Sequence, residues 1–382
     1  MKSIFFATFS LLLALPVAVR AAEEPIGDKP AVRRDAMLRA QLAKPYPPSG
    51  CWHYEDFALA AYWLDQRTDE ADEALLIERE NEFPLALDSG SFHWHAYLLE
   101  RIYFLFGSTS KHHPGRMSAE AEAALLEMLW QWAGPRCRLE MTLPERDWWI
   151  WGSENHHAQA GAGFWGAAQI FAGHRDYRDR RFADGTSPRE MARAFDDYFK
   201  RFAFERAAKG LLVECNSAYN KYTLGGWYNM ADFAEDAELR RRMRMLLDLF
   251  WTDWAIEQID GVRGGSRHRC YPGNTSTVQS GMTGASWFHF GLGTPRSKHP
   301  SVMCAATTFW RPLPIVADLA RDSGERGVYE TISRRPGLAE PADDEPRNFV
   351  DDPDHPFYEA RDIYGLRPEG GGLLRYSYCT PD

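Results

Sequence analysis

Hydrophobic residues recur at helical spacing through most of this 382-residue chain. From about residue 31 to residue 325, apolar positions repeat every three to four residues, which is typical of helices with one buried face. Strand-like alternation is nearly absent before residue 360. The pattern predicts helices near 32–43, 52–66, 69–80, 92–106, 117–133, 155–172, 187–206, 218–236, 238–256 and 306–322.

Segments rich in Gly, Pro or Asp separate most of the predicted helices. They are predicted as loops over 84–90, 107–115, 134–147 and 184–188, and connections of this kind suit antiparallel helix pairs. Successive pairs can form an open solenoid or a closed ring of inner and outer helices, and the chain has no fixed-length repeat. We therefore expect an all-α fold, an (α/α) toroid built as an incomplete barrel of helical hairpins.

The C-terminal part has a different composition. Residues 324–372 are polar and carry many Pro, Gly and Asp residues, which predicts a long loop or linker. Residues 373–378 alternate in polarity, which predicts the start of a β region. The expected organisation is a helical catalytic domain over 23–325 and a loop-rich segment over 326–382.

The first residues resemble an export signal. Lys2 gives a basic start, an apolar run follows from Ile4 to Val19, and small residues at 21 and 22 mark a cleavage site. We therefore expect a signal peptide over 1–22 and a periplasmic or secreted protein. The run is too short for a membrane span, and no later segment has eighteen uninterrupted apolar residues.

The six cysteines lie at 51, 137, 215, 270, 304 and 379. An oxidising compartment permits disulfides among them, with fifteen possible pairings. None has the CxxC spacing of a metal site, and the histidine pairs 93/95, 112/113 and 156/157 lack the i, i+4 spacing of a zinc helix. We therefore expect no metal and no cofactor.

Charge and composition narrow the class of ligand. The 44 Lys and Arg residues face 54 Asp and Glu residues, a net charge of −10, which disfavours nucleic acid or an anionic membrane as the partner. The chain has 14 Trp residues, and exposed tryptophan rings stack on sugars and other flat ligands. The sequence contains no GxSxG or GxxxxGK[ST] motif, and its GxGxxG match at 161–166 lies inside the predicted helix 155–172 and not at a strand-to-helix turn, which argues against common serine hydrolases and nucleotide enzymes.

The first chemical motif spans residues 148–157, WWIWGSENHH. Ser153 is a suitable N-cap for the helix that follows. The next three residues, Glu154, Asn155 and His156, then occupy the first helical turn, where free N–H groups and the helix dipole favour an anion such as a carboxylate. In the alternative interpretation, Glu154 only caps the helix and the histidines are ordinary polar residues.

The second motif spans residues 213–222, VECNSAYNKY. Asn216 or Ser217 can cap a helix that carries Tyr219 and Tyr222 three residues apart on one face. A tyrosine pair at this spacing also occurs in ordinary core packing. A phenol can nevertheless exchange a proton with a substrate when nearby cations lower its pKa.

The third motif is a basic island over residues 261–271, GVRGGSRHRCY. Arginine side chains bind carboxylates through two parallel hydrogen bonds, and the flanking glycines let the backbone approach a ligand. The candidates here are Arg263, Arg267, Arg269 and Tyr271. The same pattern also fits a structural arginine network or a surface loop.

The order of the helices predicts that these motifs meet. If 92–106, 155–172 and 218–236 are inner helices of one ring, they point the same way and their N-termini share one rim. The arginine loop follows an outer helix, so it reaches the same rim, as do His93 and Trp94 at the start of another inner helix.

The sequence Trp151–His156, followed about sixty residues later by Glu214–Tyr219, resembles the Asn-His and Tyr motifs of (α/α)-toroid polysaccharide lyases, with alginate and glucuronan lyases as the nearest comparison. The resemblance spans roughly residues 50–290. It implies catalytic roles for Asn155, His156 and Tyr219 and for one or more of Arg263, Arg267 and Arg269, with Arg267 taken as the catalytic candidate. The implied substrate-binding residues are Glu154, His157, Trp151, Asn216, Tyr222, Arg263, Arg269, Tyr271, His93 and Trp94.

The resemblance leaves open which of the adjacent imidazoles, His156 or His157, and which of the phenols, Tyr219 or Tyr222, acts in catalysis. Such lyases often continue into a C-terminal β-sandwich, so the ending at Asp382 is expected to represent a truncated chain.

The resemblance implies β-elimination on a uronic-acid polysaccharide, an anionic partner. Two alternatives stay open. One is a glycoside hydrolase on the same ring that uses two carboxylates such as Glu154 with Glu214 or Asp147. The other is an exported glycan-binding protein without turnover.

Overall fold

The fold is described from a computed structural model, in which residues 30–50, 52–214, 219–264, 282–295, 300–322, 325–338, 363–368 and 374–380 are placed. Several predicted features lie outside these residues. They are the signal peptide over 1–22, the cysteines 51, 215 and 270, and the candidate residues Asn216, Arg267, Arg269 and Tyr271.

Helices make up most of the described chain, which confirms the mainly α prediction. They are α1 (Pro30–Leu42), α2 (His53–Leu64), α3 (Thr68–Ile77), α4 (Phe83–Asp88), α5 (His93–Phe106), α6 (Ala119–Arg136), α7 (Glu154–Gly173), α8 (Pro188–Ala208), α9 (Asn220–Phe233), α10 (Ala237–Ala255), α11 (Thr283–Phe290), α12 (Pro300–Thr307) and α13 (Pro314–Arg321). A π-helical turn, Glu78–Glu82, joins α3 to α4.

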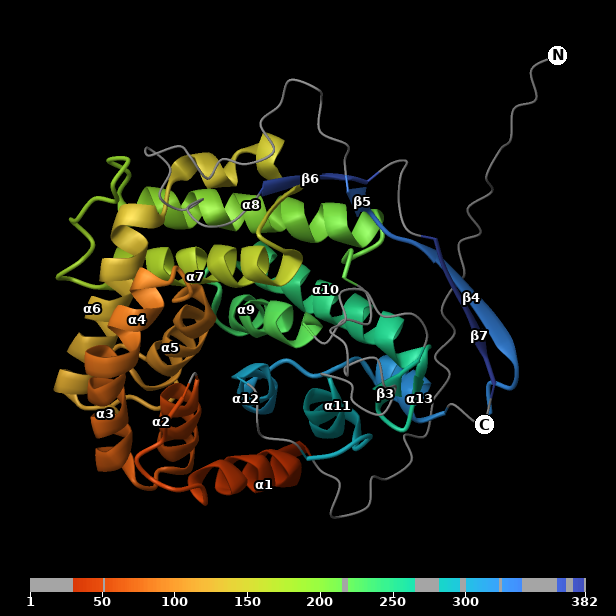
Figure 1. Ribbon diagram of the computed structural model, residues 1–382, viewed down its shortest axis with the longest axis horizontal. Helices are drawn as coiled ribbons and strands as arrows, with labels where there is room; N and C mark the ends of the chain where they lie inside the picture. The colour runs from red at the N-terminus through yellow and green to blue at the C-terminus, as the bar shows by residue number, and fades with distance from the viewer. Residues whose placement is uncertain are drawn as a thin grey trace.

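The helices pack in a regular order (Figure 1). Helix α2 contacts α5, α5 contacts α7, α7 contacts α9, α9 contacts α12, and α12 contacts α2. Helix α6 contacts α3 and α7, and α8 contacts α7 and α10.

Small residues allow helices α5, α7 and α9 to approach one another closely. A methyl group added at Gly226 of α9 would lie 2.2 Å from the Cβ of Ala162 in α7, and one added at Gly166 of α7 would lie 2.2 Å from a carboxyl oxygen of Glu100 in α5. Only glycine fits such contacts. Helices α7 and α9, whose starts lie at the first and second sequence motifs, are therefore packed at short range.

Many of the tryptophans belong to the core. Trp165, Trp227, Trp251 and Trp254 are almost fully buried. Their large apolar surfaces fill the space between helix layers, so the high tryptophan count reflects core packing as well as the candidate site.

Short strands complete the fold. They are β1 (Trp149–Trp151), β2 (Gln258–Ile259), β3 (Val262–Arg263), β4 (Tyr329–Arg334), β5 (Gly337–Leu338), β6 (Ile363–Arg367) and β7 (Leu374–Cys379). All pairings are antiparallel: β1 and β5 flank β6, β2 pairs with β3, and β4 pairs with β7 in the register Tyr329↔Cys379 to Arg334↔Leu374. The predicted C-terminal β region is therefore present as β7.

The structure corrects four local predictions. The segment 84–90, predicted as a loop, is largely the helix α4. The helix predicted over 306–322 is interrupted, because Pro312 and Pro314 cannot continue α12, and α13 begins only at Pro314. The predicted linker 324–372 contains β4, β5 and β6, and the helix α11 was not predicted.

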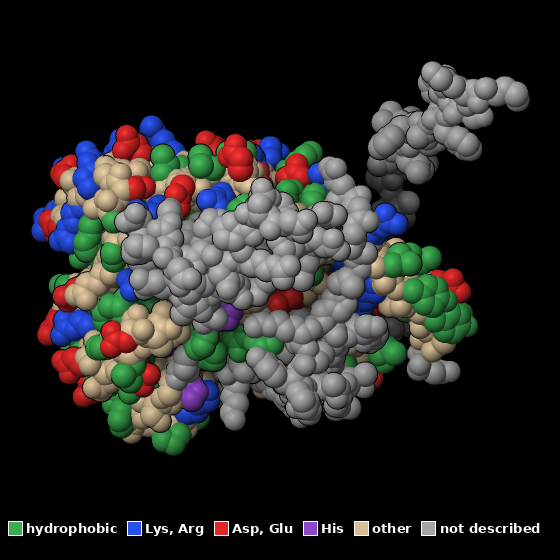
Figure 2. Space-filling view, turned by 45° about the horizontal axis from the view of Figure 1, so that its top comes forward, with side chains coloured by type: hydrophobic (Ala, Val, Ile, Leu, Met, Phe, Trp, Pro, Cys, Tyr) green, Lys and Arg blue, Asp and Glu red, His purple; other side chains and the backbone are tan. Residues whose placement is uncertain are grey.

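The surface carries charges of both signs (Figure 2). On the described surface at the left of that view, Lys and Arg side chains alternate with Asp and Glu side chains. At the right edge, the outer face of the β4–β7 ribbon exposes the apolar side chains Ile332, Leu374, Tyr376 and Tyr378. Within the described part of the chain, no helix has the length and apolar character needed to cross a membrane.

Candidate functional site

A cavity of about 200 Å³ lies where α5, α7 and α9 begin. It is lined by Trp52, Trp94, Asn155, His156, Gln159, Tyr219 and Tyr222. Five of these side chains were predicted to belong to one site: Trp94, Asn155, His156, Tyr219 and Tyr222. They come from three helix starts far apart in the sequence, and they meet as the order of the helices predicts.

A second cavity shows the common direction of the same helices. About 740 Å³ in volume, it is lined by residues from the C-terminal ends of α5, α7 and α9, among them Phe104, Gly173 and Phe233. The three helices therefore place their N-termini at one cavity and their C-termini at the other.

The start of α7 is built as the sequence predicts. The Ser153 side chain accepts a hydrogen bond from the backbone N–H of His156, which confirms Ser153 as the N-cap. The Ser153 hydroxyl donates to Oδ1 of Asn155 at 2.7 Å. This bond fixes the amide so that its acceptor faces Ser153, and Asn155 and His156 sit in the first turn, where backbone N–H groups favour an anion.

The hydrogen bonds of His156 define its tautomer. The Trp94 indole N–H lies 3.1 Å from His156 Nδ1, and His93 Nε2 lies 2.7 Å from the same atom. An indole nitrogen can only donate. His156 Nδ1 must therefore accept, and the neutral His156 ring carries its hydrogen on Nε2.

The aromatic rings around His156 contact one another. The His93 ring lies 5.0 Å from those of both His156 and Trp151, measured between ring centres. Trp151 therefore supports the site from behind His93. His93 and Trp151 do not line the cavity, so their role here is to orient His156.

The opposite wall is aromatic as well. The rings of Tyr219 and Tyr222 are 6.0 Å apart, and the Trp52 ring lies 5.5 Å from that of Tyr222 and 6.1 Å from that of Trp94. The Trp52 indole N–H donates to the backbone carbonyl of Trp94 at 2.9 Å, which fixes the ring. The cavity thus combines flat apolar faces with an amide, an imidazole and two phenols.

The start of α9 differs from the prediction. The helix begins at Asn220, and Tyr219 itself occupies the N-cap position without a side-chain capping bond. The Asn220 side chain donates to the backbone carbonyl of Glu214 at 2.6 Å. Tyr219 therefore projects from the helix start and not from a helix interior.

Lys221 is a buried cation beside this wall. Its ammonium nitrogen lies 4.7 Å from the centre of the Tyr222 ring, and the side chain is buried. Burial lowers the pKa of Lys221 to about 8. The contact of Lys221 with Tyr222 was not predicted from the sequence.

Glu154 holds two parts of the site together. Its carboxylate accepts hydrogen bonds from the backbone N–H groups of Val213 at 3.1 Å and Glu214 at 2.8 Å, and Arg206 Nη1 lies 3.6 Å away. Burial raises the pKa of Glu154, while Arg206 and the two amides act in the opposite direction. Glu154 is thus engaged between α7, α8 and the segment before Tyr219, and it does not line the cavity.

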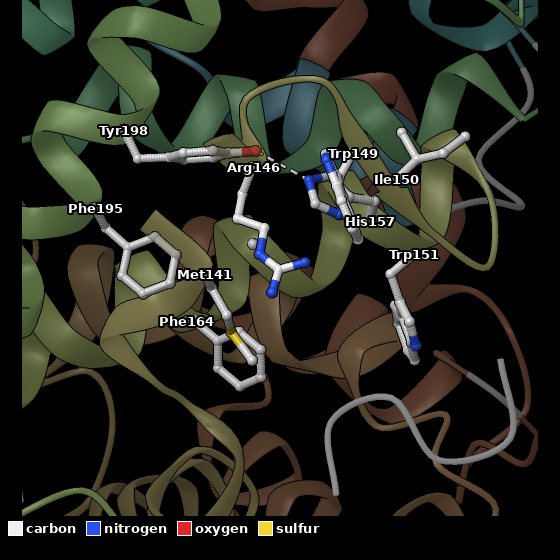
Figure 3. Close-up of a pocket in the computed structure, with 10 residues that line it drawn as sticks. Met141, Arg146, Trp149, Ile150, Trp151, His157, Phe164, Phe195 and Tyr198 are labelled. Atoms are coloured by element: carbon white, nitrogen blue, oxygen red, sulfur yellow. Dashed lines mark hydrogen bonds between the residues drawn. The ribbon is translucent and has the colours of Figure 1, made fainter. Parts of the chain in front are cut away.

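His157 points to a different place. Its Nε2 lies 2.9 Å from the hydroxyl of Tyr198, in a small apolar pocket that also includes Trp149 and Phe164 (Figure 3). Burial, aided by the positive charge of Arg206, lowers the pKa of His157 to about 4. Of the two adjacent histidines, His156 lines the cavity and His157 packs against α8.

Arg263 departs from the predicted substrate-binding role. Its guanidinium is buried and bonded to Glu257 at 2.7 Å and Asp253 at 2.7 Å. The same two carboxylates bind Arg335 and Arg375 from the C-terminal strands. Arg263 belongs to a structural network, the alternative that the sequence had left open, because two acidic residues of α10 and the turn after it surround it.

The cysteines 137, 304 and 379 are free thiols.

Two cavity residues, Trp52 and Gln159, were not predicted. Gln159 lies one turn after Asn155, a spacing that places both on the same helix face, so the helical spacing could have identified Gln159.

Comparisons with protein-family models, curated proteins and solved structures found no match to this chain.

Proposed function

We propose that this protein is a polysaccharide lyase that cleaves a uronic-acid polymer, such as alginate or a glucuronan, by β-elimination. One observation carries the proposal. Asn155, His156, Tyr219 and Tyr222 line one cavity whose remaining walls include the flat rings of Trp52 and Trp94. An amide and an imidazole at a helix start suit a carboxylate, the phenols suit proton transfer, and the indoles suit a sugar ring.

The reaction removes the proton at C5 of the uronate, next to the C6 carboxylate, and expels the glycosidic oxygen at C4. The obstacle is the negative charge that develops on the carboxylate side of C5. In this proposal, Asn155, the Nε2–H of His156 and the N-terminus of α7 receive that carboxylate. Each well-placed donor of this kind is worth about 3–4 kcal/mol in the transition state.

Tyr219 is the proposed acid and base. As a phenolate it would abstract the C5 proton, and as a phenol it would protonate the leaving oxygen, each step contributing about 10²–10⁴-fold. Tyr222 is the alternative, and its contact with Lys221 is relevant because a nearby cation favours the phenolate form. The arginines predicted at 267 and 269 would add positive charge.

The contacts of the carboxylates disfavour a hydrolase. Glu154 is engaged with two backbone amides and Arg206, and Asp147 forms an ion pair with Arg201 at 2.9 Å. None of Glu154, Asp147 and Glu214 lines the cavity. Among the described residues, the cavity therefore lacks the acid and the base that a two-carboxylate hydrolase needs.

The proposal includes an (α/α) toroid. The closed order of contacts α2, α5, α7, α9 and α12 supports a ring of inner helices, with α3, α6, α8 and α10 outside. The proposal also includes export to the periplasm or medium, since a secreted polymer is the substrate.

The test is incubation of the purified protein with alginate, glucuronan, heparin-like and pectic polymers, followed by ultraviolet absorbance of unsaturated ends. We expect absorbance to rise with at least one uronate polymer. Reducing sugar without unsaturated ends would instead identify a hydrolase. Binding with neither product would identify a glycan-binding protein, and both outcomes would overturn the proposal.

A further inference from the structure

Three side chains from three separate elements converge in a buried cluster behind the cavity. Glu55 comes from α2, Glu78 from the π-helical turn Glu78–Glu82, and His95 from α5. Their ligand atoms all lie within 4.8 Å of one another. The exposed fractions of the side chains are 0%, 1% and 5%.

The cluster has fewer donor hydrogens than its oxygens require. His95 Nδ1 lies 2.6 Å from Oε1 of Glu55 and 3.4 Å from Oε1 of Glu78. A ring nitrogen carries at most one hydrogen, so it can serve only one of these oxygens. Among the described residues, both oxygens of Glu78 and Oε2 of Glu55 accept no hydrogen bond.

Leaving several carboxylate oxygens buried and unbonded is costly. The neighbouring Asp56, also buried, has neither oxygen hydrogen-bonded within the described chain. The region thus concentrates buried carboxyl groups, and a cation placed among them would satisfy several oxygens at once.

The local backbone is also unusual at this point. Glu78 is the first residue of a π-helical turn, a geometry that appears frequently at functional sites. The His95 ring is stacked on Phe92 with 5.9 Å between ring centres and 10° between ring planes. The imidazole orientation is therefore fixed by packing, as is usual for a histidine that ligates a metal.

From these contacts we infer that Glu55, Glu78 and His95 form a binding site for one divalent transition-metal ion of the Zn²⁺ type. Two carboxylates and an imidazole suit Zn²⁺, whereas Ca²⁺ and Mg²⁺ prefer oxygen ligands alone. Atoms that share a tetrahedral Zn²⁺ lie about 3.4 Å apart, close to the separation of His95 Nδ1 and Glu78 Oε1. For both residues to bind the same Zn²⁺, the distance between His95 Nδ1 and Glu55 Oε1, 2.6 Å in this structure, needs to lengthen only slightly.

This site would link α2, α5 and the turn that joins α3 to α4, and it holds no residue that lines the cavity. Its expected role is structural. His95 follows Trp94 directly, so a metal on His95 would hold the start of α5 in place. The inference does not depend on the proposed lyase activity.

The test is metal analysis of the full chain, purified without a histidine tag and treated with EDTA. After addition of Zn²⁺ and removal of excess, we expect about one Zn²⁺ per chain, and a rise in Tm of about 5 °C at a hundredfold excess of Zn²⁺ over its Kd. Co²⁺ should give a visible absorption band typical of a tetrahedral site. Ca²⁺ should have little effect.

Glu78→Gln and His95→Gln should each abolish the Zn²⁺ stoichiometry, the Tm rise and the Co²⁺ band. The matched control is Glu100→Gln, which changes another buried carboxyl group on α5 that does not belong to the cluster, and it should keep all three. Absence of bound Zn²⁺ in the wild type would overturn the inference. So would Zn²⁺ binding that survives both Glu78→Gln and His95→Gln.

Discussion

Glu154→Gln tests how the two halves of the candidate site are joined. The wild-type carboxylate accepts one backbone N–H on each oxygen, from Val213 and Glu214, and faces the guanidinium of Arg206. Glutamine has nearly the same volume. Its NH₂ group must face one of the two N–H donors, so one hydrogen bond is replaced by a donor–donor contact.

The magnitude follows from the surroundings of Arg206. Its side chain is 1% exposed, and none of its guanidinium nitrogens has a hydrogen-bond partner among the described residues. Glu154 is the carboxylate that the described residues place within ion-pair distance of Arg206, and removing the charge of such a buried partner typically costs about 3–5 kcal/mol. Activity should also fall, because the segment that Glu154 holds leads directly to Tyr219.

The assay is equilibrium unfolding in urea, followed by tryptophan fluorescence. The matched control is Glu205→Gln on α8, where the Glu205 carboxylate pairs with Lys209 at the partly exposed surface, and a loss below about 1 kcal/mol is expected. A loss for Glu154→Gln no larger than that of the control would refute the reasoning.

Three further changes are predicted. Lys221→Met should raise the free energy of unfolding at pH 7 by up to about 3 kcal/mol, because burial lowers the Lys221 pKa from 10.5 to about 8. Between these two pH values, the unfolded wild type binds more protons than the folded wild type. The stability of the wild type should therefore rise from pH 8 to 10.5, and that of the variant should not. Gly226→Ala, whose added methyl would meet Ala162 at 2.2 Å, should cost about 3 kcal/mol or more in urea unfolding, whereas Gly173→Ala meets no atom within 4 Å and should be nearly neutral. Trp52→Ala should raise KM roughly tenfold with little change in kcat, measured by initial rates.

The sequence predicted best those features that depend on neighbouring residues. Helical periodicity located α5, α7 and α10 to within a few residues, and the Ser153 cap follows from the residue type. The common position of Asn155 and Tyr219 followed from helix order, because antiparallel pairing fixes which ends meet.

Features that depend on distant partners could not be predicted in this way. The role of Arg263 is set by Asp253 and by arginines more than seventy residues later, and no local pattern shows this pairing. The cluster of Glu55 and His95 likewise joins separate helices, so the spacing rule for zinc helices could not find it. The short helix α11 contains a glycine and aromatic residues, which weaken its helical signal.

The most direct test of the central claim is the mass of the products formed from a uronate polymer by the wild type, Tyr219→Phe and Tyr103→Phe. Tyr103 lies on α5 at the cavity at the other ends of the same helices and serves as the control. The account predicts unsaturated fragments, each lighter by one water than a hydrolysis product, from the wild type and Tyr103→Phe, with a loss of at least about 10²-fold in Tyr219→Phe. Fragments that carry the added water, or full unsaturated product from Tyr219→Phe, would contradict it.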